Sequence, residues 1–183
     1  VTQLNEPTLV SDAAWSQVVA YQGHAAGIRE DGTLWAWGWN EHGQLGIGDK
    51  VNPWAITQVG TDTDWATVDV GEIHTVALKT DGSLWGIGTN VWGQLGLGAT
   101  PEALSPVRIV TGLYSDAAAG HRHTLAIDQD GKLWATGYNL FGSLGDGTNV
   151  NKNVLVQVGT DTDWSTVYAE GHASMALRED RTR

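Results

Sequence analysis

Short runs in which apolar and polar residues alternate recur along the entire chain. Examples from one part of the sequence are WATVDVG, HTVALKT and SLWGIGT, and the runs are interrupted by Gly, Asp and Asn. A period of two with such interruptions is typical of β-strands joined by tight turns. A weaker fourth run, as in WAITQVG, VRIVTG and VLVQVG, precedes each new set. No stretch has a sustained apolar period of 3.6 residues, so the pattern predicts an all-β chain.

The set of runs repeats about every 50 residues. Asp31, Asp81, Asp130 and Asp180 are 50, 49 and 50 residues apart, and aligning the chain on them brings the surrounding residues into register. About four short strands per repeat, and about fifteen strands in all, are typical of the blades of a β-propeller. We interpret the chain as one domain, residues 1–183, with repeats at approximately 1–50, 51–99, 100–149 and an incomplete 150–183.

Three motifs within each repeat are specific. They are clearest as GEIHTVAL, DGSLWGIGTN and GQLGLG, at residues 71–78, 81–90 and 93–98. They resemble the repeat of the regulator of chromosome condensation family, and the resemblance covers essentially the whole chain. It implies a propeller, usually seven-bladed, built from four-stranded antiparallel blades, of which this chain would hold about three and a half. Single departures, such as Tyr21 and Glu170 in the column of Gly71 and Ser143 in place of a Gln, weaken individual columns only.

A seven-bladed ring with this period needs about 350 residues, so we expect a segment of a longer protein, with two chains completing one ring as the alternative. An open arc exposes strand edges and blade faces, which predicts self-association through the open edges of the propeller. The phrase VGTDTDW occurs at residues 59–65 and 158–164. It resembles tandem arrays of bacterial secreted or surface proteins, which favours an extracellular or cell-surface location.

Composition and charge argue against several kinds of partner. The chain has 21 acidic and 10 basic residues, a formal net charge of −11, and no cysteine. The acidic charge opposes binding to nucleic acid or to anionic membranes. No apolar run approaches the roughly 20 residues of a membrane span, so no membrane insertion is expected. Without cysteine there is no disulfide, thiolate nucleophile or Cys-type zinc site.

The residues with catalytic or ligand-binding chemistry all belong to repeated columns. Catalysis needs one asymmetric constellation, so we expect no enzyme activity, no catalytic residue, no cofactor and no metal. We interpret His24, His74 and His123 as inner-strand residues hydrogen-bonded to neighbouring turns, with a ring of metal ligands as the alternative. The acidic turns TDTDW and DQDG are interpreted as turn formers rather than calcium ligands. The GQLGIG turn lacks the following helix that a phosphate site needs.

Three further columns are interpreted as structural. The Asp-Gly pairs predict hairpin turns because Gly tolerates positive φ. The Trp column is expected in the core or between blades, and the Leu column is expected to insert between neighbouring blades. These columns are Asp31, Asp81 and Asp130; Trp35, Trp85 and Trp134; and Leu45, Leu95 and Leu144.

Positions that vary while their surroundings repeat are the candidates for binding. They flank the Asn of the second motif, in or beside a loop at the end of each predicted blade. Propellers present binding contacts from such loops on a rigid scaffold, and exposed aromatic residues are strong anchors there. The interaction candidates are Trp39, Tyr138, Glu41, His42, Trp92 and Phe141.

These features together predict a non-catalytic interaction module that presents its blade loops to a protein partner of unknown identity. Two alternatives stay open. The resemblance implies guanine nucleotide exchange on a small GTPase, although the even spacing of the repeats leaves no room for an inserted wedge. The chain could instead be an architectural or adhesive segment of a surface protein.

Overall fold

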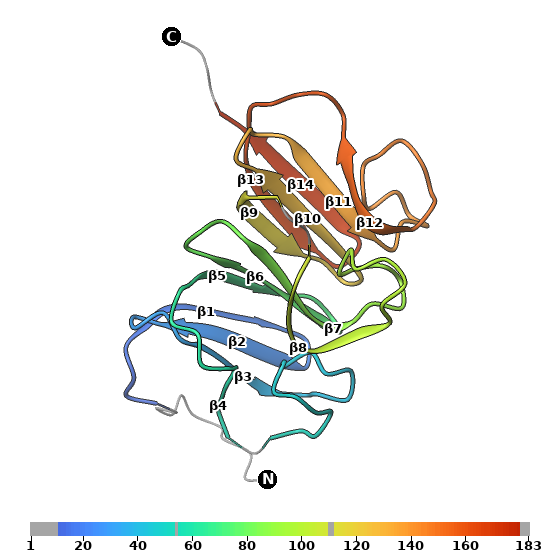
Figure 1. Ribbon diagram of the computed structural model, residues 1–183. Coiled ribbons are helices and arrows are strands. Elements are labelled where there is room, and N and C mark those ends of the chain that lie inside the picture. Colours follow the sequence, from blue (N-terminus) through green and yellow to red (C-terminus); the bar gives the residue numbers. More distant parts are fainter. Residues whose placement is uncertain (1–10, 54, 110–111, 180–183) are drawn as a thin grey trace.

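The computed structural model describes residues 11–53, 55–109 and 112–179, and this part of the chain contains fourteen β-strands. The strands form three four-stranded sheets and one two-stranded sheet, all antiparallel (Figure 1). The first sheet contains β1 (Trp15–Tyr21), β2 (His24–Arg29), β3 (Leu34–Gly38) and β4 (Thr57–Gln58). The second contains β5 (Trp65–Val70), β6 (His74–Lys79), β7 (Leu84–Thr89) and β8 (Glu102–Arg108). The third contains β9 (Tyr114–Ala119), β10 (His123–Asp128), β11 (Leu133–Gly137) and β12 (Lys152–Val158), and the last pairs β13 (Trp164–Glu170) with β14 (Ala173–Arg178).

Each sheet is one blade, and the blades follow one another from the N-terminal to the C-terminal end of the molecule (Figure 1). Within every full blade the strands pair in chain order, so each is a simple meander. The first and the last blade lie at opposite ends of the arrangement. The all-β prediction is confirmed: the chain is a propeller segment of three four-stranded blades and a partial fourth.

The weaker fourth run of each repeat completes the preceding blade. Strands β4, β8 and β12 pair with β3, β7 and β11. The repeat boundaries drawn near residues 50, 99 and 149 therefore fall inside blades, because the chain loops out after the third strand and returns along the edge of that same strand. Asp180, which marks the fourth repeat in the sequence, lies outside the described residues.

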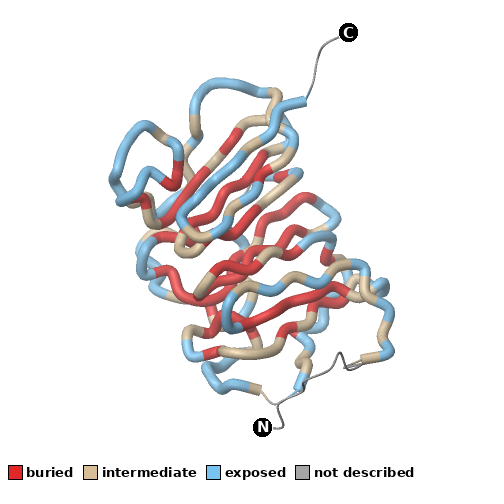
Figure 2. Tube along the Cα trace, turned by 180° about the vertical axis from the view of Figure 1, so that it is seen from behind, coloured by how far each residue is buried: buried red, intermediate tan, exposed pale blue. Residues whose placement is uncertain are grey.

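The hydrophobic core lies between successive blades rather than within one blade. Ile28 and Leu34 of the first blade share a cluster with Val68 and Ile87 of the second. Equivalent clusters join the second blade to the third and the third to the fourth. Figure 2 shows the buried strands in the middle of the molecule and the exposed loops around them. A blade cannot bury its faces alone, so each one depends on its neighbours.

The Leu column occupies this core. Leu45, Leu95 and Leu144 are fully or almost fully buried. Leu45 belongs to the cluster between the first and second blades, and Leu144 to the cluster between the third and fourth. Leu95 packs beside Gly86 of β7.

The Asp-Gly hairpins also connect neighbouring blades. The Asp31 carboxylate accepts the backbone N–H of Thr33 at 3.0 Å, which closes the turn. Gly32 has a φ of +77°, and a Cβ atom there would collide with the carbonyl oxygen of Thr63. The Gly32 carbonyl in turn accepts the N–H of Trp65, the first residue of the next blade. Glycine is therefore required both by the turn and by the close approach of the following blade.

Candidate functional site

The column histidines join neighbouring blades through hydroxyl groups. His74 Nε2 lies 3.1 Å from Thr124 Oγ1 on the next blade, and that hydroxyl donates to the Gln94 carbonyl at 2.7 Å. Since the hydroxyl proton is used, the imidazole must donate from Nε2. The same arrangement recurs at His24 with Thr75 and at His123 with Ser174.

These histidines are neutral at physiological pH. Burial lowers the pKa of His74 to about 3 and the pKa values of His24 and His123 to about 4. Their partners are hydroxyl groups of the adjacent blade, rather than the turn directly. Among the described residues, no three His, Asp or Glu side chains are grouped so that they could hold a metal ion.

Four backbone N–H groups of the glycine-rich turn after β3 are engaged in hydrogen bonds. The N–H groups of Gly43 and Gly46 donate to the carbonyls of Asn40 and Gly43 within the turn. The Leu45 N–H donates to the Asn40 side chain, and the Gly48 N–H donates to Leu104 of the second blade. The turn therefore connects one blade to the next, and these four N–H groups are already used within the protein rather than free to bind a phosphate.

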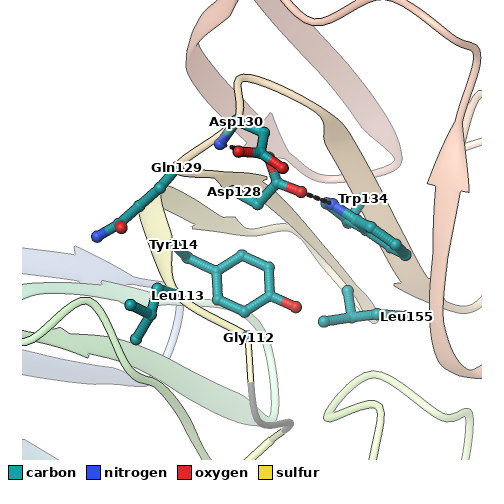
Figure 3. A pocket seen from close by; sticks show the side chains of 8 residues that line it. All are labelled: Gly112, Leu113, Tyr114, Asp128, Gln129, Asp130, Trp134 and Leu155. Carbon is teal, nitrogen blue, oxygen red and sulfur yellow. Dashed lines mark hydrogen bonds between the residues drawn. The ribbon is translucent and has the colours of Figure 1, made fainter.

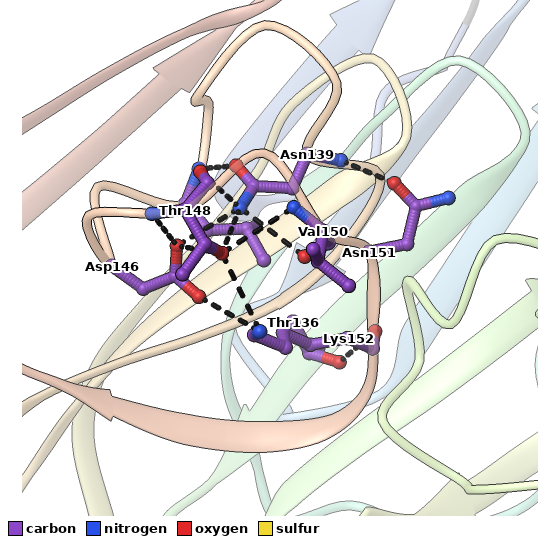
Figure 4. Close-up of polar contacts among 8 residues, drawn as sticks. Thr136, Asn139, Asp146, Thr148, Val150, Asn151 and Lys152 are labelled. Atoms are coloured by element: carbon purple, nitrogen blue, oxygen red, sulfur yellow. Dashed lines mark hydrogen bonds and ion pairs between the residues drawn. The ribbon is translucent and has the colours of Figure 1, made fainter.

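A buried Asn organises each loop that follows a third strand. Asn139 accepts the N–H of Leu144 at 2.9 Å and donates to the Thr148 carbonyl and the Asp146 carboxylate, each at 3.0 Å. Its own N–H donates to Asn151 Oδ1 at 2.8 Å (Figure 4). Asn40 and Asn90 are buried in the same role. These bonds hold the loops, so residues beside the Asn are presented from a firm backbone.

Three of the interaction candidates form one exposed cluster. The ring centroids of Trp92 and Tyr138 are 5.3 Å apart, and those of Tyr138 and Phe141 are 5.9 Å apart. His172 of the fourth blade joins them, with its ring 4.9 Å from Phe141. We call Trp92, Tyr138, Phe141 and His172 the aromatic patch. It spans the second, third and fourth blades, on the side where the third strands β7 and β11 end.

A small charged network lies against two rings of the patch. The Arg122 Nε atom donates to Glu72 Oε2 at 2.8 Å, and His121 Nε2 lies 3.1 Å from the same oxygen. The Arg122 guanidinium lies 5.7 Å from the Trp92 ring centroid, and the His121 ring is 4.7 Å from His172. Burial lowers the pKa of His121, the opposing effect of Glu72 being smaller. The network therefore contacts two of the patch rings, Trp92 and His172.

The patch is open to solvent. Phe141 is 70% exposed and Trp92 is 37% exposed, while the adjacent Val91 and Leu140 are also exposed. Exposed apolar side chains grouped in this way mark interaction surfaces on soluble proteins.

The other three candidates lie apart from the patch. Trp39 and His42 form their own edge-to-face pair in the first blade, with ring centroids 5.0 Å apart, and Glu41 is exposed beside them. The aromatic side chains of the first blade are not continuous with the patch, because the second blade has Thr89 in the column of Trp39 and Tyr138. Sequence reasoning missed His172, because its GH pair is displaced by one residue in the fourth repeat. It also missed Arg122 and His121, which vary in the same manner as the chosen candidates.

The opposite end of the blades carries cations packed on tryptophans. The Lys79 ammonium lies 4.9 Å from the ring centroids of both Trp65 and Trp85. It also pairs with the carboxylates of Asp62 at 2.6 Å and Asp64 at 3.0 Å. The acidic TDTDW turn therefore holds a protein cation.

The same arrangement occurs in the first and fourth blades. Arg29 lies 3.6 Å from the centroid of Trp35 and 5.3 Å from that of Trp15, and Arg178 lies 5.0 Å from that of Trp164. Asp161 and Asp163 pair with Arg178. Arg29, Lys79 and Arg178 share one column of the repeat, so the alignment contained the signal for this feature. The Trp column is accordingly only partly buried.

No helix in the described part of the chain is long and apolar enough to cross a membrane. Among curated proteins, the chain is similar to the ultraviolet-B receptor UVR8 of Arabidopsis thaliana, with 41% identity over 46 residues. That match covers 24% of this chain and 10% of the receptor.

Solved structures match over most of the chain. Prp20p from Saccharomyces cerevisiae aligns with a TM-score of 0.79 and 19% identity, covering 91% of this chain and 44% of Prp20p. The same yeast protein in its complex with Kap60 aligns with a TM-score of 0.80 and 23% identity, covering 95% of this chain and 43% of the yeast protein. Human WBSCR16 aligns with a TM-score of 0.75 and 23% identity, covering 86% of this chain and 44% of WBSCR16. The chain thus spans less than half the length of these structures, and the similarity shows the fold.

These relatives come from a plant, a yeast and human, so the bacterial origin expected from VGTDTDW finds no support in them. The family model described as the regulator of chromosome condensation (RCC1) repeat matches residues 31–78 and 81–127. A second model with the same description matches residues 15–44 and 114–143. Both fit the blades of the structure, and the chain belongs to the regulator of chromosome condensation repeat family.

Proposed function

We propose that this chain is a non-catalytic protein-interaction module whose main contact surface is the aromatic patch. The observation that carries the proposal is the continuity of the patch: rings from three successive blades contact one another, with Trp92, Phe141 and His172 exposed and Tyr138 half-buried between them. Exposed Trp and Tyr side chains on a firm scaffold lose little entropy on binding and supply large apolar contacts.

The supporting network suits this role. Arg122 and His121 hold the patch rings through Glu72, so the surface is largely formed before a partner arrives. A preformed surface avoids part of the ordering cost of association. The partner chemistry that fits best is an apolar or aromatic side-chain cluster, because the patch itself has no acidic member.

A displayed peptide library tests this proposal while the natural partner is still unidentified. Selection against the wild-type chain, with counter-selection against the Trp92→Ala/Phe141→Ser double variant, should enrich peptides with apolar anchors. We expect these peptides to lose at least tenfold in affinity for the double variant, which corresponds to about 1.4 kcal/mol. Val51→Ser, an exposed apolar position in the loop of the first blade, is the matched control.

The result that contradicts the proposal is equally clear. If the wild-type chain selects no peptide that discriminates against the double variant, the patch is not the contact surface. Nucleotide exchange on a small GTPase and a purely architectural role would then be the remaining alternatives. A nucleotide-release assay over a panel of small GTPases separates these two.

A second property, self-association, is favoured by the end blades. Met175 and Leu177 of β14 are 60% and 46% exposed, whereas Val76 and Leu78 in the same columns of the second blade are buried against the third. At the other end, Val18 of β1 is exposed while its counterpart Val68 is buried. We propose that these open faces pair between chains.

Sedimentation velocity over a range of concentrations tests self-association. We expect concentration-dependent association for the wild-type chain and a shift toward monomer for Met175→Gln/Leu177→Gln. A wild-type chain that stays monomeric at all concentrations would contradict the proposal. The patch double variant should associate like the wild type, which separates this property from partner binding.

A further inference from the structure

The third blade breaks the pattern of cations packed on tryptophans. Asp128 occupies the column of Arg29, Lys79 and Arg178, so this blade has a carboxylate where the others have a cation. The two aromatic columns are retained, as Tyr114 in the column of Trp65 and Trp134 in the column of Trp85. The blade therefore keeps the aromatic walls of the arrangement and loses the cation that fills it.

A cavity occupies the corresponding place. It has a volume of about 490 Å³ and is lined by Tyr114, Trp134, Asp128, Leu113 and Leu155, among others. In Figure 3 the Tyr114 and Trp134 rings lie on two sides of this space, with Asp128 between them and Leu155 next to Trp134. In the second blade the centroids of the equivalent rings are 5.9 Å apart, and the Lys79 ammonium lies 4.9 Å from each of them.

The carboxylate is held firmly at the cavity. Asp128 Oδ1 accepts the N–H groups of Asp130 at 3.0 Å and Lys132 at 2.9 Å, and Oδ2 accepts the Trp134 indole N–H at 2.8 Å. The charge and the Trp134 ring are thus positioned together. Asp130, also at the cavity, pairs with Lys132 at 2.8 Å, and Lys132 is not among the residues that line the cavity.

The acidic partners found in the second and fourth blades are also replaced here. Asp64, which pairs with Lys79 in the second blade, corresponds to Leu113 in the third. In the third blade the carboxylate is therefore on strand β10, at Asp128, and the apolar Leu113 lines the cavity where the second blade has the acidic Asp64. An aromatic pair with one carboxylate is the combination that holds organic cations in proteins.

We propose that the cavity of the third blade binds an organic cation, an alkylammonium or guanidinium group supplied from outside the chain. It would sit between Tyr114 and Trp134, against the Asp128 carboxylate, as Lys79 sits in the second blade. Two sources share this chemistry, a free small cation and a Lys or Arg side chain of another protein. The site is at the opposite end of the blade from the aromatic patch, so it is independent of the function proposed above.

Nuclear magnetic resonance titration of the Trp134 indole N–H tests the inference, with the signal assigned by its loss in Trp134→Leu. The probes, at constant ionic strength, are choline for the free cation and acetyl-Gly-Arg-Gly-amide for the side chain. We expect saturable shifts with a Kd of about 1–10 mM for at least one probe, as suits a small ligand held by few contacts. The probe that binds more tightly identifies the source. The neutral analogue 3,3-dimethylbutan-1-ol should bind at least fivefold more weakly than choline.

Asp128→Lys supplies the missing cation from the chain itself and should abolish the shifts. Glu41→Lys changes the net charge equally at the other end of the first blade and should leave the Kd within twofold. Circular dichroism checks that each variant is folded. If Asp128→Lys fails to fold, Tyr114→Leu replaces it, with an expected loss of at least fivefold in affinity.

Three outcomes would overturn the inference. The first is the absence of a saturable shift with both cations. The second is equal binding of the neutral alcohol, which would leave only an apolar hollow. The third is an unchanged affinity in the cavity variant, which would assign the shifts to general attraction of cations by an acidic chain.

Discussion

His74 Nε2 lies 3.1 Å from the hydroxyl oxygen of Thr124, fifty residues away on the next blade. The hydroxyl passes the hydrogen bond on to the Gln94 carbonyl of the blade that His74 belongs to. One threonine thus satisfies two buried groups of its neighbour, and the contact between blades depends on it.

Thr124→Val should destabilise the chain by about 1–3 kcal/mol. The substitution preserves the shape of the side chain but leaves the imidazole N–H and the Gln94 carbonyl buried without a partner. Urea denaturation measures the effect. Thr67→Val, on an exposed strand position, is the control and should change the free energy of unfolding by less than about 0.5 kcal/mol. Equal effects for the two variants would show that the hydroxyl relay is unimportant.

The buried histidines predict loss of stability in acid. Their pKa values are lowered from 6.5 to about 4 for His24 and His123 and about 3 for His74. Below pH 6.5 the unfolded chain takes up protons that the folded chain does not, so stability is complete above 6.5 and falls as the pH decreases. Each uncompensated histidine contributes a slope of up to about 1.4 kcal/mol per pH unit.

Two carboxylates act in the opposite direction. Burial raises the pKa of Asp69 to about 6, and it also raises that of Asp116. These groups bind protons more readily in the folded chain, so they add stability as the pH falls from about 6 toward their ordinary value. Three histidines still outnumber them, and we expect the urea midpoint to decrease from pH 7 to pH 5. His74→Gln removes one of these histidines, so the pH dependence of the unfolding free energy should correspond to about one fewer proton taken up on unfolding. A urea midpoint that rises on acidification would contradict the lowered pKa values of the histidines.

Gly32→Ala should cost much more than Gly60→Ala. Both glycines have positive φ, so both substitutions carry a backbone cost of about 1–2 kcal/mol. A Cβ atom at Gly60 meets nothing within 4 Å, whereas one at Gly32 collides with the Thr63 backbone at the start of the next blade. Thermal and urea denaturation compare the two. Similar losses would mean that the blades separate there at little cost.

Lys79→Met should destabilise the chain by about 1–2 kcal/mol, because the ammonium contacts two indole rings and two carboxylates while its side chain is only 11% exposed. Lys50→Met removes the more exposed pair with Glu102 and should cost about 0–1 kcal/mol. Chemical denaturation in urea at low and high salt measures both. A larger loss at Lys50 would show that packing on tryptophan contributes little.

The sequence predicted the class of fold because the information is local. Alternation with a period of two, Asp-Gly turns and a repeat of about fifty residues describe a blade without reference to any other part of the chain. It also located the loops that carry Trp92, Tyr138 and Phe141, since these vary against a repeating background. The assignment of the fourth strand to the preceding blade was different, because the run could equally have started the next one.

The contacts between blades needed the tertiary structure. The repeat alignment contains Thr75, Thr124 and Arg122, but nothing local shows that they meet His24, His74 and Glu72 on another blade. Two residues fifty positions apart become neighbours only when the blades pack face to face. The same packing joined Trp92 to Tyr138 and left Trp39 apart. Strand pairing within the third blade placed Asp128 beside Tyr114 and Trp134. The sequence by itself determined the blade, and the tertiary structure decided the rest: packing of one blade on the next decided which side chains form a surface, and strand pairing within the third blade decided which line its cavity.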